Sequence, residues 1–138
     1  MNQVFTLSHQ DALRVVSAIQ FELEKNKQGA AIAVTDEHGE LIALLRTDGC
    51  PLASVNNAIH KAFTASRERK ESKEVGTSSK EGGWPMTNFG DLRYTAWGGG
   101  VPLVYHGQVL GAVGVSGLPE SEDIILARLG AAAFASKP

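Results

Sequence analysis

The chain has 138 residues, of which 43% are hydrophobic and 20% are charged, and its formal net charge at pH 7 is −2. This length and balance predict one globular domain over residues 1–138 and exclude a disordered chain. The near-zero charge argues against a nucleic-acid or membrane-surface partner, and the single cysteine, Cys50, excludes an intrachain disulfide and favours a reducing compartment.

The sequence carries no targeting pattern. Its opening segment, M-N-Q-V-F-T-L-S, has neither a basic region nor a long apolar run, so a signal peptide is not predicted. No apolar stretch reaches the roughly 18 residues that a membrane-spanning helix needs. We therefore expect a cytoplasmic protein.

The first third of the chain predicts a helix followed by a β-hairpin. Ser8 is a good N-cap residue, and apolar residues then recur at helical spacing as far as Leu23. Two short apolar runs, 30–35 and 41–45, flank the turn D-E-H-G at 36–39, where glycine readily adopts a positive φ.

A second helix is predicted from Leu52 to about Lys73, because Pro51 is well suited to open it. Its apolar stripe consists of Val55, Ile59, Ala62 and Phe63. The following segment, 75–90, is polar and rich in glycine. We expect it to be a long loop of the kind that often serves as a lid.

The last third predicts a second hairpin and a closing helix. Strands are expected at 101–105 and 108–116, and the second of them is apolar or glycine on both faces, which favours a central place in the sheet. Pro119 precedes acidic residues that the positive end of a helix favours. The residues thus predict an α+β fold, in which helices cover an antiparallel sheet.

Three polar residues of the second helix form the first candidate site. Asn57, Lys61 and Thr64 share one edge of this helix, beside alanines that leave room for a ligand. A lysine in such a place can bind an anionic group or, when desolvated, act as a base or amine nucleophile. The alternative, which spacing alone favours, is that Lys61 reaches to water and Thr64 bonds a carbonyl of the preceding turn.

Glycines form the second candidate site: Gly98, Gly99, Gly100, Gly111, Gly114 and Gly117. Their backbone N–H groups can approach a ligand closely. They form neither a G-x-G-x-x-G nor a Walker pattern, so nucleotide binding is not predicted. The alternative is turn and bulge chemistry, with Gly111 and Gly114 making room for a crossing helix.

The four histidines show no metal-ligand spacing, and none lies near Cys50 in sequence, so no metal site is predicted. Haem stays open as a ligand, since axial ligation of its iron needs only one residue. Ser116 in G-V-S-G lacks the second spacer of a nucleophile elbow, so a serine triad is not indicated.

Three segments together resemble one family: N-A-I-H-K-A-F-T-A-S at 57–66, G-G-G-V-P-L-V-Y-H-G-Q-V-L-G-A-V-G-V-S-G at 98–117 and E-D-I-I-L-A-R-L-G-A at 122–131. In this order they are similar to the GlcG/HbpS-like family (DUF336, also called haem-degrading), which includes the C-terminal domain of PduO-type cobalamin adenosyltransferases. The resemblance covers nearly the whole chain.

The resemblance implies a five-stranded antiparallel sheet flanked by helices, in the order α-β-β-α-β-β-β-α, with the additional strand near Tyr94 to Gly99. It implies a homo-oligomer, often a dimer building to an octamer. It also implies a pocket between the second helix and the glycine-rich strands, at Lys61, Thr64, Gly99, Pro102 and Asp123.

The first hypothesis of function is a cytoplasmic oligomer that binds a small molecule, with haem or a related tetrapyrrole as the candidate, since some relatives bind haem. Lys61 would pair with a carboxylate of the ligand, and Thr64 and the backbone of 98–100 would add hydrogen bonds. Apolar cover would come from Trp84, Phe89 and Trp97.

The second hypothesis is an enzyme acting on a small organic acid or carbonyl metabolite, since other relatives lie among genes for glycolate, glycerol or propanediol use. Lys61 would be its base or anchor, Asp123 the charge partner of Lys61, and the 75–90 loop a lid. A third option is an accessory protein whose small-residue surfaces serve only packing and assembly.

Overall fold

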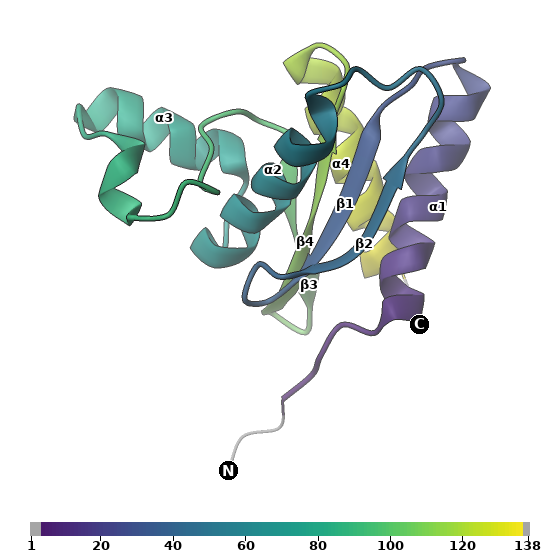
Figure 1. The fold of residues 1–138 in the computed structure, drawn as a ribbon. Helices are drawn as coiled ribbons and strands as arrows, with labels where there is room; N and C mark the ends of the chain where they lie inside the picture. Colours follow the sequence, from purple (N-terminus) through teal and green to yellow (C-terminus); the bar gives the residue numbers. More distant parts are fainter. Residues whose placement is uncertain (1–3, 137–138) are drawn as a thin grey trace.

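The computed structural model describes residues 4–136 (Figure 1). Its elements are α1 (His9–Lys25), β1 (Ala31–Asp36), β2 (Leu41–Arg46), α2 (Ser54–Glu68), α3 (Ser72–Gly82), the 3-10 helix η1 (Met86–Phe89), β3 (Gly100–Tyr105), β4 (Gln108–Ser116) and α4 (Glu120–Ala135). A four-stranded sheet of order β2-β1-β4-β3 lies between α2 on one face and α1 with α4 on the other. Of the helices between residues 4 and 136, none has the length and apolar character needed to cross a membrane.

The first helix, both hairpins and the last helix confirm the predicted elements. The Ser8 hydroxyl accepts a hydrogen bond from the Asp11 amide at 3.0 Å, which makes Ser8 the N-cap of α1. All three strand pairings are antiparallel, and β4 lies between β1 and β3, as its apolar sequence predicted. The predicted α+β class is therefore confirmed.

The two faces of the sheet differ in the size of their side chains. Alternation along β1 and β4 turns large aliphatic residues toward α1 and α4, where they join the main core: Ile32, Val34, Val113 and Val115. The face toward α2 carries Ala31, Ala33 and Ala112, packed against Ala58, Ala62 and Ala65 of that helix. Small residues on both sides let α2 lie close to the sheet.

Gly114 of β4 lies against the backbone of α2. It pairs with Ala33 of β1, and a Cβ atom placed on it would lie 2.7 Å from the backbone nitrogen of Ala62. The predicted role of Gly114, room for a crossing helix, matches this packing. The same closeness fixes where α2 presents its polar residues.

The second helix ends earlier than predicted, at Glu68. Arg69 adopts the left-handed conformation (φ 59°) and ends α2, after which α3 and η1 occupy most of the segment 75–90. The prediction of a loop over 75–90 is therefore wrong. Val75 is the one apolar side chain that α3 buries, and a single apolar residue produces no helical period in the sequence.

The strand predicted near Tyr94 to Gly99 does not form, so the sheet has four strands and not five. The Gly99 carbonyl accepts a hydrogen bond from the Val115 amide of β4 at 2.9 Å, but side chains take up other backbone groups of this segment in place of a neighbouring strand. The Gly98 amide donates to Glu120 Oε2 at 2.7 Å, and the Trp97 carbonyl accepts from the Ser72 hydroxyl at 2.8 Å. A segment held by side chains in this way shows no alternation of apolar and polar residues in the sequence, so its conformation could not be predicted from that pattern.

Candidate functional site

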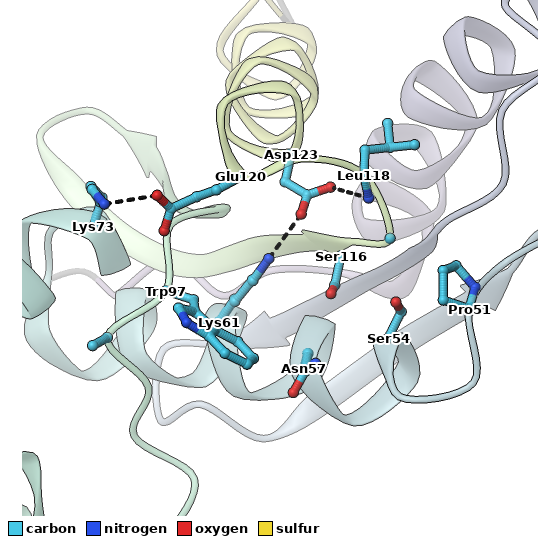
Figure 2. Close-up of a pocket in the computed structure, with 12 residues that line it drawn as sticks. Pro51, Ser54, Asn57, Lys61, Lys73, Trp97, Ser116, Leu118, Glu120 and Asp123 are labelled. Atoms are coloured by element: carbon cyan, nitrogen blue, oxygen red, sulfur yellow. Dashed lines mark hydrogen bonds and ion pairs between the residues drawn. The ribbon is translucent and has the colours of Figure 1, made fainter.

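A pocket of about 590 Å³ opens between the N-terminal half of α2, the end of β4 and the start of α4 (Figure 2). It is lined by Pro51, Ser54, Asn57, Lys61, Lys73, Ala96, Trp97, Ser116, Gly117, Leu118, Glu120 and Asp123. Four segments that are far apart in the sequence therefore build one site.

A buried ion pair forms the inner wall of the pocket. Lys61, in the middle of α2, is 3% exposed, and Asp123, in the first turn of α4, is 2% exposed. Lys61 Nζ donates to Asp123 Oδ2 at 3.1 Å and to the Val115 carbonyl at 3.0 Å, while Asp123 Oδ1 accepts from the Leu118 amide at 3.1 Å. Figure 2 shows the two side chains reaching across the pocket toward one another.

The environment of Asp123 acts on its acidity in two directions. Burial raises the pKa of the Asp123 carboxyl above its ordinary value, while the Lys61 ammonium and the amides of Leu118 and Gly117 oppose that rise. The lysine is therefore the principal group that allows a charged carboxylate to stay in this buried place.

A second ion pair lies at the outer rim of the pocket. Lys73 Nζ is 2.7 Å from Glu120 Oε1, and both side chains are partly exposed. The hydrogen bond from Lys73, together with the bond from the Gly98 amide, lowers the pKa of the Glu120 carboxyl. Glu120 thus connects the start of α4 to Lys73 of α3 and to the backbone of Gly98.

We expect Glu120→Gln to lower the free energy of unfolding by less than about 1 kcal/mol at pH 7, because this pair is screened by solvent. A depressed folded-state pKa stabilises the fold above the ordinary carboxyl pKa, and that contribution is lost as the pH falls. The deficit of the variant should therefore shrink between pH 7 and pH 3.5 in urea unfolding. If the stability difference between the variant and the unaltered chain grows on acidification, the lowered pKa of Glu120 is not its cause.

The segment 95–100 is held against the helices by two hydroxyl groups. The Thr64 hydroxyl donates to the His60 carbonyl at 2.9 Å and accepts from the Thr95 amide at 2.9 Å. The Ser72 hydroxyl, which donates to Trp97, accepts from the Gly100 amide at 2.9 Å. These contacts place Trp97, 58% exposed, on the pocket wall.

Gly99 occupies a place that a larger residue does not fit. Its φ is +123°, and a Cβ atom on it would lie 2.7 Å from the Val115 carbonyl oxygen and 3.1 Å from Lys61 Nζ. Glycine at this position therefore lets the segment close over the buried lysine.

The structure brings Asn57, Lys61 and Asp123 together on the pocket wall. The three glycines of 98–100 run beside that wall, with the amides of Gly98 and Gly100 already bonded to side chains. The other two predicted binding residues do not line the pocket. Thr64 accepts a hydrogen bond from the Thr95 amide, and Pro102 is paired with Ala112 in the sheet.

The three aromatic residues predicted as apolar cover separate in the structure. Trp97 lines the pocket. Trp84 and Phe89 pack edge to face with ring centroids 5.6 Å apart, and Phe89 stacks on Tyr94 at 4.0 Å, outside the lining residues. Trp97 alone of the three can contact a ligand in this pocket.

Sequence reasoning missed four polar lining residues: Ser54, Lys73, Ser116 and Glu120. Lys73 belongs to an alternating charge run that is typical of a solvated helix face. Glu120 has the ordinary position of an acid at a helix start. Ser116 carried the one usable signal, because it ends a buried strand directly before a glycine.

Within the described residues 4–136, no group of three or more His, Cys, Asp or Glu side chains is arranged to hold a metal ion. What the pocket offers instead is a set of ammonium, hydroxyl and carboxylate groups around a partly apolar wall.

Comparison with known proteins places this architecture among established relatives. Protein GlcG of Escherichia coli (strain K12) is 39% identical over 110 residues, which cover 80% of this chain and 81% of GlcG. A solved double mutant of Streptomyces reticuli HbpS has a TM-score of 0.85 at 28% identity, covering 96% of this chain and 89% of HbpS.

A complex of PduOC with heme shares the fold, with a TM-score of 0.85 at 23% identity over 94% of this chain and 95% of PduOC. Residues 7–132 match the family described as Haem degrading protein HbpS-like. The match spans nearly all of the sequence, and the resemblance noted from its motifs is confirmed. This chain belongs to the HbpS-like family.

Proposed function

We propose that this chain binds a small molecule in the pocket beside Lys61 and Asp123, with haem or a related tetrapyrrole as the first candidate ligand. The observation that carries the site is a buried lysine, paired with Asp123, on the wall of a pocket of about 590 Å³. Buried ionisable groups gather at functional clefts. The family description and the heme complex of PduOC support the choice of ligand.

The lining residues fit the periphery of a tetrapyrrole and do not fit its iron. Trp97 offers an aromatic face to a flat ring, and the partly exposed Lys73 offers an ammonium group to a carboxylate. The described lining residues include no His, Cys, Met or Tyr, the side chains that usually hold haem iron. The proposal therefore includes no ligation of the iron by this pocket.

A haem titration followed by absorbance tests this proposal. We expect saturable binding at one haem per chain. Trp97→Ala should weaken the affinity for haem about tenfold, because the tetrapyrrole loses its contact with the indole ring. Trp84→Ala is the matched control, since Trp84 lies outside the pocket, and it should bind haem like the unaltered chain. Unsaturable absorbance, or equal affinity in Trp97→Ala, would overturn haem binding at this site.

We also propose that the protein works as a cytoplasmic homo-oligomer, between a dimer and an octamer. The single cysteine of the sequence supports a reducing compartment, and the family resemblance supports assembly. Sedimentation of the purified chain tests the oligomeric state, and a monomer at all concentrations would overturn it.

A second candidate function is an enzyme acting on a small organic acid or carbonyl metabolite. The observation that favours it is the Lys61–Asp123 pair, which sets a proton donor and a carboxylate on one pocket wall. In that case Lys61 and Asp123 would be the catalytic residues. The lid once expected at 75–90 has no part in this proposal, because α3 and η1 occupy most of that segment.

A further inference from the structure

We infer that the buried end of this pocket binds an uncharged oxygen of its ligand, a carbonyl or hydroxyl group, in preference to a carboxylate. The ligand class that this inner end favours is a small polar carbonyl or hydroxy compound, as in the second candidate function, whereas a tetrapyrrole would occupy the pocket with its carboxylates at the rim near Lys73. The inference rests on the proposed function to the extent that a ligand must enter this pocket.

The charges that line the pocket are already matched. It has two ammonium groups, Lys61 and Lys73, and two carboxylates, Asp123 and Glu120, joined as pairs at 3.1 Å and 2.7 Å. A ligand carboxylate next to Lys61 would share one buried ammonium with Asp123. Two carboxylates around one cation in a place of low dielectric repel one another, so the inner end disfavours a second anion.

The same inner end has hydrogen-bond donors to spare. An ammonium group has three N–H bonds, and Lys61 uses two of them, toward Val115 and Asp123. Among residues 4–136 no further acceptor contacts Lys61 Nζ, so its third N–H remains for a ligand. This donor attracts an oxygen lone pair without requiring a new negative charge.

Two serine hydroxyls complete the inner end. Ser54 and Ser116 are each 5% exposed, and both line the pocket. No side-chain oxygen of the described residues is both fully buried and without a partner. The Ser116 hydroxyl makes no hydrogen bond within residues 4–136, so it meets solvent through the pocket. Figure 2 shows both hydroxyls turned into the space between α2 and the end of β4.

The lysine and serine groups of the pocket indicate which end of a ligand is neutral and which end can be charged. A hydroxyl both donates and accepts, so the Ser116 hydroxyl suits a carbonyl or hydroxyl oxygen that enters beside Lys61. The Ser54 hydroxyl, which bonds the Cys50 thiol, borders the same space. An acidic group elsewhere in the ligand would lie at the rim near Lys73, whose side chain is partly exposed. The buried end therefore selects for a neutral oxygen, and the rim tolerates charge.

A pair of probes that differ in charge and little in shape tests this assignment. Lactamide and lactate are titrated at pH 7 into the isotope-labelled protein, with nuclear magnetic resonance shifts of Ser54, Ser116 and Gly117 as the readout. We expect saturable shifts with lactamide and at least tenfold weaker binding of lactate. Equal or tighter binding of lactate would overturn the inference.

Ser116→Ala should weaken lactamide binding about fivefold, because one hydrogen bond is lost. Ser78→Ala is the matched control, since Ser78 is exposed on α3 and lies outside the pocket. Unchanged affinity in Ser116→Ala would overturn the inference. If haem shifts the pocket resonances and lactamide does not, the inference alone fails; if neither shifts them, the proposed function fails as well.

Discussion

Lys61→Met is expected to lower the free energy of unfolding by about 3–5 kcal/mol at pH 7, because it leaves the Asp123 carboxylate buried without its partner. Methionine fills a similar volume, so the loss should come from charge more than from packing. Urea unfolding measures the change. Lys80→Met, on the exposed face of α3, is the matched control and should change stability by less than about 0.5 kcal/mol.

The double variant Lys61→Met with Asp123→Asn should recover most of that loss, since a neutral amide can still accept from the Leu118 amide. A double variant as unstable as the single one would show that the buried charge is not the cause. This comparison also supplies a folded protein without the ion pair for binding studies.

The single variant also makes a prediction about pH. Without Lys61, only the amides of Leu118 and Gly117 oppose the rise that burial causes in the pKa of Asp123, so the folded state holds the carboxyl proton more tightly than the unfolded state does. Stability must then fall as the pH rises above the ordinary carboxyl value of 3.8. The deficit of Lys61→Met should be smallest near pH 4 and largest at neutral pH.

Gly114→Ala is expected to cost about 3 kcal/mol or more, because the new methyl group meets the backbone of α2 and not a flexible side chain. Gly83→Ala is the control: Gly83 has φ +69° with no atom within 4 Å of an added Cβ, so it tests backbone strain alone and should cost about 1–2 kcal/mol. Equal losses in the two variants would contradict close packing of α2 on the sheet.

The regular elements with a clear period could be predicted from the sequence. Ser8 marks the start of α1, and the turn glycines Gly39 and Gly107 mark both hairpins, where φ is +91° and +75°. Pro119 and the acids after it mark α4. In each case the signal is local, so neighbouring residues are enough to specify the element.

What could not be predicted depends on contacts between distant segments. Gly76 of α3 fits against the Ala96 backbone, and Ser72 binds both ends of the Trp97–Gly100 segment, but neither residue stands out in its own part of the sequence. The pairing of Lys73 with Glu120 joins residues 47 positions apart. The sequence therefore pointed to Lys61 and Asp123, which line one pocket in the structure, and did not point to the serine and rim residues of that pocket.

The inner wall of the pocket is made by elements of the core. Lys61 belongs to α2 and Asp123 to α4, which cover opposite faces of the sheet, and Ser116 ends the central strand β4. A ligand that binds only the folded chain raises the free energy of unfolding by about 2.7 kcal/mol at a hundredfold excess over its dissociation constant. Melting temperature is thus a sensitive and unbiased readout for this protein, suited to screening chemical libraries before any activity is known.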